Sequence, residues 1–91
     1  LLGCRREVSC VYGRIDLLTH HLLIEVKSRE DWMKGLGQLL SYGVDYPDRR
    51  KVLYIYDGGL PDTHVAVCRS HKIRVVTDPD RLMRLEARYR C

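Results

Sequence analysis

The segment 13–27 of this sequence, GRIDLLTHHLLIEVK, places two carboxylates and a lysine where they could act together. Two apolar runs flank a pair of histidines, which is typical of a hairpin. If its turn has two residues, Asp16 lies opposite Glu25, and Lys27 shares their face. Opposed carboxylates repel unless one is protonated or a cation lies between them. The pattern favours a bound divalent cation; the alternative is an ordinary hairpin with a solvated charged face.

The elements that position these residues are strands. Residues 6–12, 14–19 and 22–27 are rich in strand-forming side chains and are separated by Gly13 and by the histidine pair. They predict an antiparallel meander of three consecutive strands. The histidines at its second turn are expected to be exposed turn residues and not metal ligands.

The period of the apolar residues then changes to that of a helix. Ser28 is a candidate capping residue, followed by acids in the first turn. Gly35 and Gly43 on the apolar side predict close approach of the helix to a sheet. Lys34, Gln38 and Tyr42 form a second line along the edge of that face. The apolar face itself, which we expect to pack on the sheet, consists of Trp32, Gly35, Leu36, Leu39, Leu40 and Gly43.

The second half of the chain predicts further strands joined by crossovers. Residues 51–57 form an apolar run and therefore a buried strand. Residues 61–71 fit either a short helix or a strand. We favour the helix, because 72–77 then forms a last strand reached by a second crossover. Asp78 and Pro79 begin a basic terminal helix. The predicted fold class is α/β, with a mixed β-sheet (antiparallel meander plus crossover strands) flanked by helices.

Composition indicates one globular domain spanning residues 1–91, with 45% hydrophobic and 31% charged residues. The net charge of +4 tilts the chain toward a polyanionic partner. No apolar run is long enough for a membrane span, and no signal peptide is visible. The four cysteines show no zinc-ligand spacing. We therefore expect reduced cysteines and an intracellular location, in cytoplasm or nucleus, with Cys10 and Cys68 as small core residues.

The phrases GRIDLLT, IEVK and WMKGLGQLLSY occur in a fixed order, and an apolar strand follows them. This set resembles the PD-(D/E)XK nuclease superfamily, which has the restriction-endonuclease-like fold and includes Holliday-junction resolvases. The similarity covers roughly residues 6–77, and it is closest to nuclease domains of large DNA viruses and mobile elements.

The resemblance implies Mg²⁺-dependent (or Mn²⁺-dependent) hydrolysis of DNA phosphodiester bonds. Asp16, Glu25 and the backbone carbonyl of Val26 would hold the metal, since Mg²⁺ prefers oxygen ligands and keeps several waters. Lys27 would orient the attacking water or stabilise the transition state, and Gln38 would border the site. The enzyme would be a metal-dependent phosphodiesterase, an endonuclease in the first instance, with exonuclease action as the other option.

Basic residues are candidates for contact with DNA, the expected partner. The clusters at 49–51 and 69–74 flank the second crossover and could line a phosphate track. The candidate nucleic-acid contacts are Arg14, Lys34, Tyr42, Arg49, Arg50, Lys51, Arg69 and Lys72.

One departure from the resembled family concerns the start of the chain. Family members carry a helix before the first strand, often with another acid near the metal, and residues 1–5 are too short for it. We expect a longer parent chain or a partner subunit, including a homodimer, to supply that part. Two other functions stay open: a nuclease-fold module that binds nucleic acid without cutting it, and a small structural domain with an accidental motif.

Overall fold

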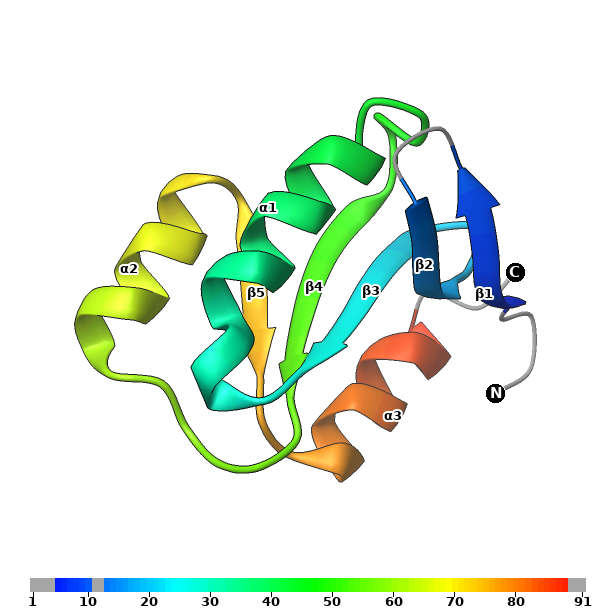
Figure 1. Ribbon diagram of the computed structural model, residues 1–91. Coiled ribbons are helices and arrows are strands. Elements are labelled where there is room, and N and C mark those ends of the chain that lie inside the picture. The colour runs from blue at the N-terminus through cyan, green and yellow to red at the C-terminus, as the bar shows by residue number, and fades with distance from the viewer. Residues whose placement is uncertain (1–4, 11–12, 89–91) are drawn as a thin grey trace.

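The computed structural model describes residues 5–10 and 13–88, whose strands form one five-stranded mixed sheet in the order β1-β2-β3-β4-β5 (Figure 1). The side chains of residues 5–14 lie outside this description. The strands are β1 (Arg5–Cys10), β2 (Gly13–Leu18), β3 (Leu22–Lys27), β4 (Arg50–Ile55) and β5 (Ile73–Val76). The helices are a 3₁₀ turn η1 (Arg29–Asp31), α1 (Trp32–Tyr42), α2 (Asp62–Ser70) and α3 (Pro79–Arg88).

The turn between β2 and β3 has the two residues that the sequence predicts. The Thr19 N–H donates to the Leu22 carbonyl at 2.9 Å, and the Thr19 hydroxyl accepts from the Leu22 N–H at 2.8 Å. Both histidines between them are exposed. This closure sets the register Leu18↔Leu23 and Leu17↔Ile24, so Asp16 and Glu25 are the next pair in the same register.

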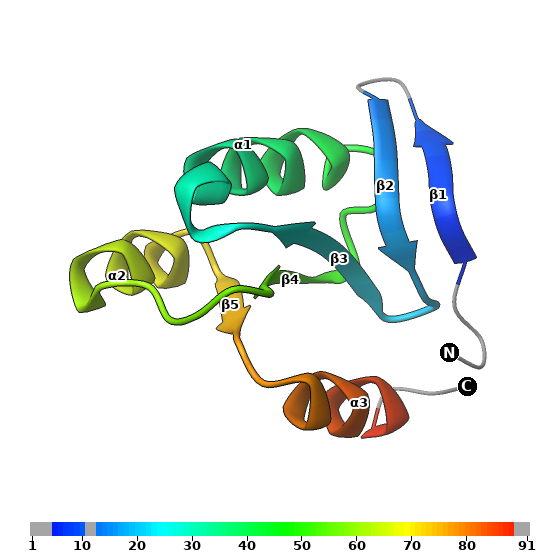
Figure 2. The same ribbon diagram turned by 60° about the horizontal axis from the view of Figure 1, so that its bottom comes forward.

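Two crossovers follow the meander, and both confirm the predicted mixed sheet. β3 pairs with β4 in parallel, and β4 pairs with β5 in parallel. Helices α1 and α2 lie on one face of the sheet, while α3 lies on the other, as the turned view shows (Figure 2). The segment for which sequence allowed a helix or a strand is the helix α2, as favoured.

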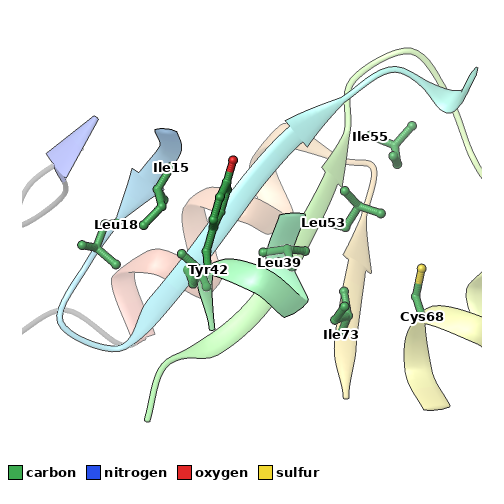
Figure 3. Packing of buried hydrophobic residues seen from close by; sticks show 9 residues of the cluster. Ile15, Leu18, Leu39, Tyr42, Leu53, Ile55, Cys68 and Ile73 are labelled. Carbon is green, nitrogen blue, oxygen red and sulfur yellow. The ribbon is translucent and has the colours of Figure 1, made fainter. Parts of the chain in front are cut away.

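Each face of the sheet has its own apolar cluster. On the α1 face, Leu39 and Tyr42 of α1 pack with Ile15, Leu53 and Cys68 (Figure 3). On the α3 face, a second cluster joins Leu22, Ile24, Val52, Val76, Leu82 and Leu85. The alternation of side chains along β3 and β4 therefore divides between two buried faces, which is why neither strand shows a simple polar–apolar pattern.

Helix α1 approaches the sheet closely at Gly35. A β-carbon placed there would lie 2.5 Å from Leu53 Cδ1 and 2.8 Å from Lys27 Cγ. A β-carbon is not accommodated at such distances unless the side chains of Leu53 and Lys27 shift, so glycine is favoured where α1 passes over β3 and β4. This confirms the predicted close approach and brings α1 directly over Lys27.

Two details of the predicted helix are wrong. Ser28 makes no side-chain capping hydrogen bond; its carbonyl instead accepts from the Asp31 N–H at 3.1 Å, forming the 3₁₀ turn that precedes α1. Leu40 is 38% exposed and does not pack on the sheet, whereas Leu39 is fully buried. Fewer residues of α1 are therefore buried against the sheet than the apolar spacing indicates. The chain leaves β3 through the 3₁₀ turn before α1 begins.

Within the described residues, no helix combines the length and the apolar character that crossing a bilayer needs. Cys68 is a buried free thiol, as predicted. The side chain of Cys10 lies outside the described residues.

Candidate functional site

Glu25 is a buried carboxyl group without a hydrogen-bond donor. It lies in the middle of β3, is 1% exposed, and neither of its side-chain oxygens has a hydrogen-bond partner among the described residues. A buried ionised carboxylate needs a cation, a donor or a proton. Glu25 therefore carries a proton or takes a positively charged ligand that the described residues do not supply.

Asp16 lies against Glu25 from the neighbouring strand. One of its oxygens, Oδ2, accepts from the Val26 N–H at 2.9 Å, which holds the side chain toward β3. Glu25 lies on the α1 face, because side chains alternate along β3 and Leu23 belongs to the cluster under α1. The Asp16 carboxyl interacts directly with that of Glu25, as the hairpin register predicts.

The environment of Glu25 raises its pKa from 4.5 to about 9. Burial is the largest cause, and the adjacent Asp16 carboxyl adds to it, while Lys27 acts in the opposite direction. At neutral pH and without a metal ion, Glu25 is thus protonated and can share that proton with Asp16. A divalent cation would displace the proton and be held by both carboxylates.

Lys27 completes the cluster at the carboxyl end of β3. It follows Glu25 by two residues, so both side chains lie on the α1 face. Its methylene stem packs under Gly35 of α1, as the contact at Lys27 Cγ shows. The side chain is half-buried, and its positive charge acts to lower the pKa of Glu25.

Gln38 is the fourth predicted site residue, and it lies on α1 one turn before Tyr42. Tyr42 packs beside Ile15 of β2 (Figure 3). Gln38, four residues before Tyr42, shares its side of α1. Its amide oxygen is buried without a hydrogen-bond partner among the described residues.

These residues fit a hard divalent cation. The two carboxylates supply the oxygen ligands that Mg²⁺ and Mn²⁺ prefer, and that of Glu25 has no hydrogen-bond partner among the described residues. Val26 follows Glu25 in β3 and is joined to Asp16 through its N–H. Among the described residues, no group of three or more histidines, cysteines or acids gathers in one place. A metal held here would therefore keep open positions for water or a phosphate oxygen.

The predicted nucleic-acid contacts are divided between places. Lys34 is exposed on α1. Tyr42 is 3% exposed and forms part of the core, so its ring is not presented to a ligand. The prediction placed Tyr42 with Lys34 along one edge of α1. Tyr42 instead lies on the side of the helix that faces the sheet. The side chain of Arg14 lies outside the described residues.

The remaining predicted contacts line three adjoining hollows around the edge strand β5. The first has a volume of about 350 Å³, and its cationic residues are Arg69, Lys72, Arg74 and Arg81. The second has about 500 Å³, with Arg49, Arg50, Lys51, Lys72, Arg74 and Arg88. The third has about 350 Å³, with Arg74, Arg81, Arg84 and Arg88. We call these nine residues the cationic surface. None of the three hollows is lined by Asp16 or Glu25.

Four members of the cationic surface were missed by sequence reasoning. Arg74, which lines all three hollows, was passed over within its basic cluster. Arg81, Arg84 and Arg88 recur at i, i+3 and i+7 on α3 and so share one side of that helix. That spacing was visible in the sequence, but only the fold shows that β5 brings Arg74 to the same side.

Similarity to known proteins was found with curated proteins of Acanthamoeba polyphaga mimivirus. The chain is 37% identical over 75 residues to KilA-N domain-containing protein L33, which covers 80% of this chain and 30% of that protein. It is 43% identical over 56 residues to protein L32 of the same description, covering 62% of this chain and 15% of that protein. A third relative, R878, is 41% identical over 51 residues.

The chain thus spans less than a third of the length of these relatives. No family model matches the chain, and no solved structure matches it.

The comparisons correct the family prediction. The relatives are named for KilA-N, a domain that is not the PD-(D/E)XK nuclease fold. The identification with that superfamily is therefore wrong. It relied on short phrases around Asp16, Glu25 and Lys27, and such phrases can occur without the family that they resemble. The chain is similar to segments of mimivirus KilA-N domain-containing proteins.

Proposed function

We propose that this chain is a DNA-binding module of a larger protein. The observation that carries the proposal is the cationic surface, where nine Arg and Lys side chains from four parts of the chain line adjoining hollows. No carboxylate is among the described residues that line them, and the only printed ion pair of these nine is that of Arg49 with the neighbouring Asp48, at 3.0 Å. Such a surface matches a polyanion, because bound phosphates release counterions. The relatives support this assignment, since KilA-N domains bind DNA.

Charged residues on an edge strand have a simpler use, which is to prevent pairing with another sheet. That use explains Lys72 and Arg74 on and beside β5. It does not explain the arginines of α3, nor those before β4, which lie away from the open edge. The larger surface therefore favours ligand binding.

The test of this proposal is DNA binding by the 91-residue chain at several salt concentrations, followed by fluorescence anisotropy of labelled DNA. If about half of the nine cations contact phosphates, affinity falls by roughly one hundred-fold to five hundred-fold between 50 and 200 mM salt. Absence of binding at low salt, or an affinity that hardly changes with salt, contradicts the proposal.

A second candidate function rests on a separate observation, the unpartnered Glu25 carboxyl beside Asp16 and Lys27. We propose that this site binds Mg²⁺ or Mn²⁺ and hydrolyses phosphodiester bonds. Asp16 and Glu25 would hold the ion with the Val26 carbonyl, and Gln38 would border them. The ion supplies charge neutralisation and an acidified water, while Lys27 positions that water or the phosphate.

Cleavage is tested by incubating the chain with supercoiled, linear, single-stranded and four-way-junction DNA in Mg²⁺, Mn²⁺ or EDTA. Nicking or cutting that requires the metal, and that is lost in Glu25→Gln, is the expected result. Intact DNA in every metal condition would reduce the site to a buried carboxyl pair and leave the binding function alone.

A further inference from the structure

The cationic surface contains the side chains that bind phosphates and none that stack on bases. Besides its arginines and lysines, the described residues lining its hollows are the aliphatic Leu22, Val52, Val65, Ile73 and others of that kind, with Pro47. Proteins that bind single strands place bases on aromatic rings, and sequence readers combine amide side chains for adenine with arginine for guanine. Among the described residues that line this surface, only arginine is of these types, and arginine also binds phosphate.

None of the aromatic residues that the structure describes lines the three hollows. Trp32 and His64 stack on each other with ring centroids 4.3 Å apart, between α1 and α2 on the other face of the sheet. Tyr42 is in the core under α1, and Tyr54 packs against the apolar cluster on the α3 face. The Tyr46 ring is covered by the Arg49 guanidinium at 5.1 Å. Among the described residues, the hollows therefore offer a base no ring to stack on.

Helix α3 arranges its charges in a line. Arg81, Arg84 and Arg88 lie along one side of the helix over roughly 10 Å, from the rise of 1.5 Å per residue. Arg74 of β5 lines the same hollow as these three. The only acid in the middle of the helix, Glu86, is 2% exposed and turned into the protein. The result is an exposed cationic line, and duplex DNA presents one negative charge per roughly 1.7 Å of its axis.

We infer that the cationic surface binds the phosphate backbone of double-stranded DNA without reading its sequence, with the duplex lying along α3 and the β5 edge. This rests on the proposed DNA-binding function and specifies its ligand. Helix α3, which carries three of its arginines, lies on the face of the sheet opposite Asp16 and Glu25 (Figure 2). Binding therefore does not need the carboxyl pair.

The test compares short duplexes of unrelated sequence with their separated strands, by anisotropy at matched salt. We expect the duplex to bind at least about tenfold more tightly than either strand, and unrelated duplexes to agree within about threefold. The variant Arg81→Gln with Arg84→Gln should weaken duplex binding by about tenfold or more and lower the salt slope by about two. Both positions are exposed, so the variant should melt like the parent.

The matched control removes two exposed cations from the α1 side, Arg29→Gln with Lys34→Gln. It should leave duplex binding within about twofold of the parent, since these residues lie outside the three hollows. Tighter binding of single strands, or a larger loss in the control than in the α3 variant, overturns the inference while DNA binding stands. Absence of all DNA binding removes both.

Discussion

At the scale of single residues, Glu25 is a carboxyl group whose negative charge the surrounding residues, taken together, destabilise. It is buried, lacks a donor and faces Asp16, so its proton stays bound far above the usual range. Natural proteins seldom keep a carboxyl in this state without a use for it. Ionisation of Glu25 should therefore lower the free energy of unfolding of the metal-free protein, which can be measured.

Replacement of Glu25 tests this cost through pH. The folded pKa of about 9 exceeds the unfolded value of 4.5, so the contribution of Glu25 to stability is complete below pH 4.5 and declines as pH rises toward 9. The free energy of unfolding in EDTA should fall by up to about 1.4 kcal/mol per pH unit between pH 5 and 8. Glu25→Gln should flatten this decline in melts by circular dichroism.

Cys68 does not disturb this measurement. Burial raises the pKa of its thiol, which therefore stays protonated in a scan that ends at pH 8. Parallel profiles for the parent and for Glu25→Gln would show that the pKa of Glu25 is not displaced.

Replacement of Asp16 by Asn tests whether this residue binds a metal ion or only supports the local structure. The side-chain oxygen of Asn can still accept from the Val26 N–H, so the local backbone should hold. Without metal, stability should stay nearly level at neutral pH, because Glu25 is then protonated and the pair carries no repulsion between two charges. Added Mg²⁺ should raise the melting temperature of the parent more than that of Asp16→Asn, by mass action. A variant that melts well below the parent in EDTA and gains equally from Mg²⁺ would make Asp16 structural.

At the scale of elements, helix α1 fixes the site by its approach to β3 and β4. Gly35 allows contact over Lys27 and Leu53, while Leu39 fills the core beside Tyr42. The apolar spacing and the glycines made this placement predictable. The 3₁₀ turn and the exposure of Leu40 were not, because the sequence does not say how the chain leaves the β3 end.

Two glycines of α1 give a matched pair of substitutions. Gly35→Ala should destabilise the protein by about 1–2 kcal/mol, since overpacking against Leu53 outweighs the gain in helix propensity. Gly37→Ala meets nothing within 4 Å and should stabilise by up to about 1 kcal/mol. Urea unfolding measures both. Equal stabilisation by the two alanines would mean that α1 lies farther from the sheet.

Two adjacent leucines test the same helix from the apolar side. Leu39 is fully buried, so Leu39→Ala should cost about 2–5 kcal/mol. Leu40 is 38% exposed, and Leu40→Ala should stay within about 1 kcal/mol of the parent. The reverse order in urea unfolding would place the other side of α1 against the sheet.

At the scale of the whole molecule, the sheet separates two charged regions. The carboxyl pair lies under α1, and the cationic surface lies around β5 and α3. Sequence reasoning found the first, because the turn at His20-His21 fixes the register of Asp16 and Glu25. It found only part of the second, because Arg74 and the α3 arginines are distant in sequence from Arg49 and meet only through the two crossovers.

The central claim is that this chain binds DNA through the cationic surface, chiefly through helix α3 and strand β5. The most direct measurement is the change in backbone amide shifts of the ¹⁵N-labelled chain when a short DNA duplex is added. Shifts should be concentrated in residues 49–51, 69–76 and 80–88, with those of α1 nearly unchanged. Shifts concentrated in α1, or spread evenly over the chain, would contradict DNA binding through this surface.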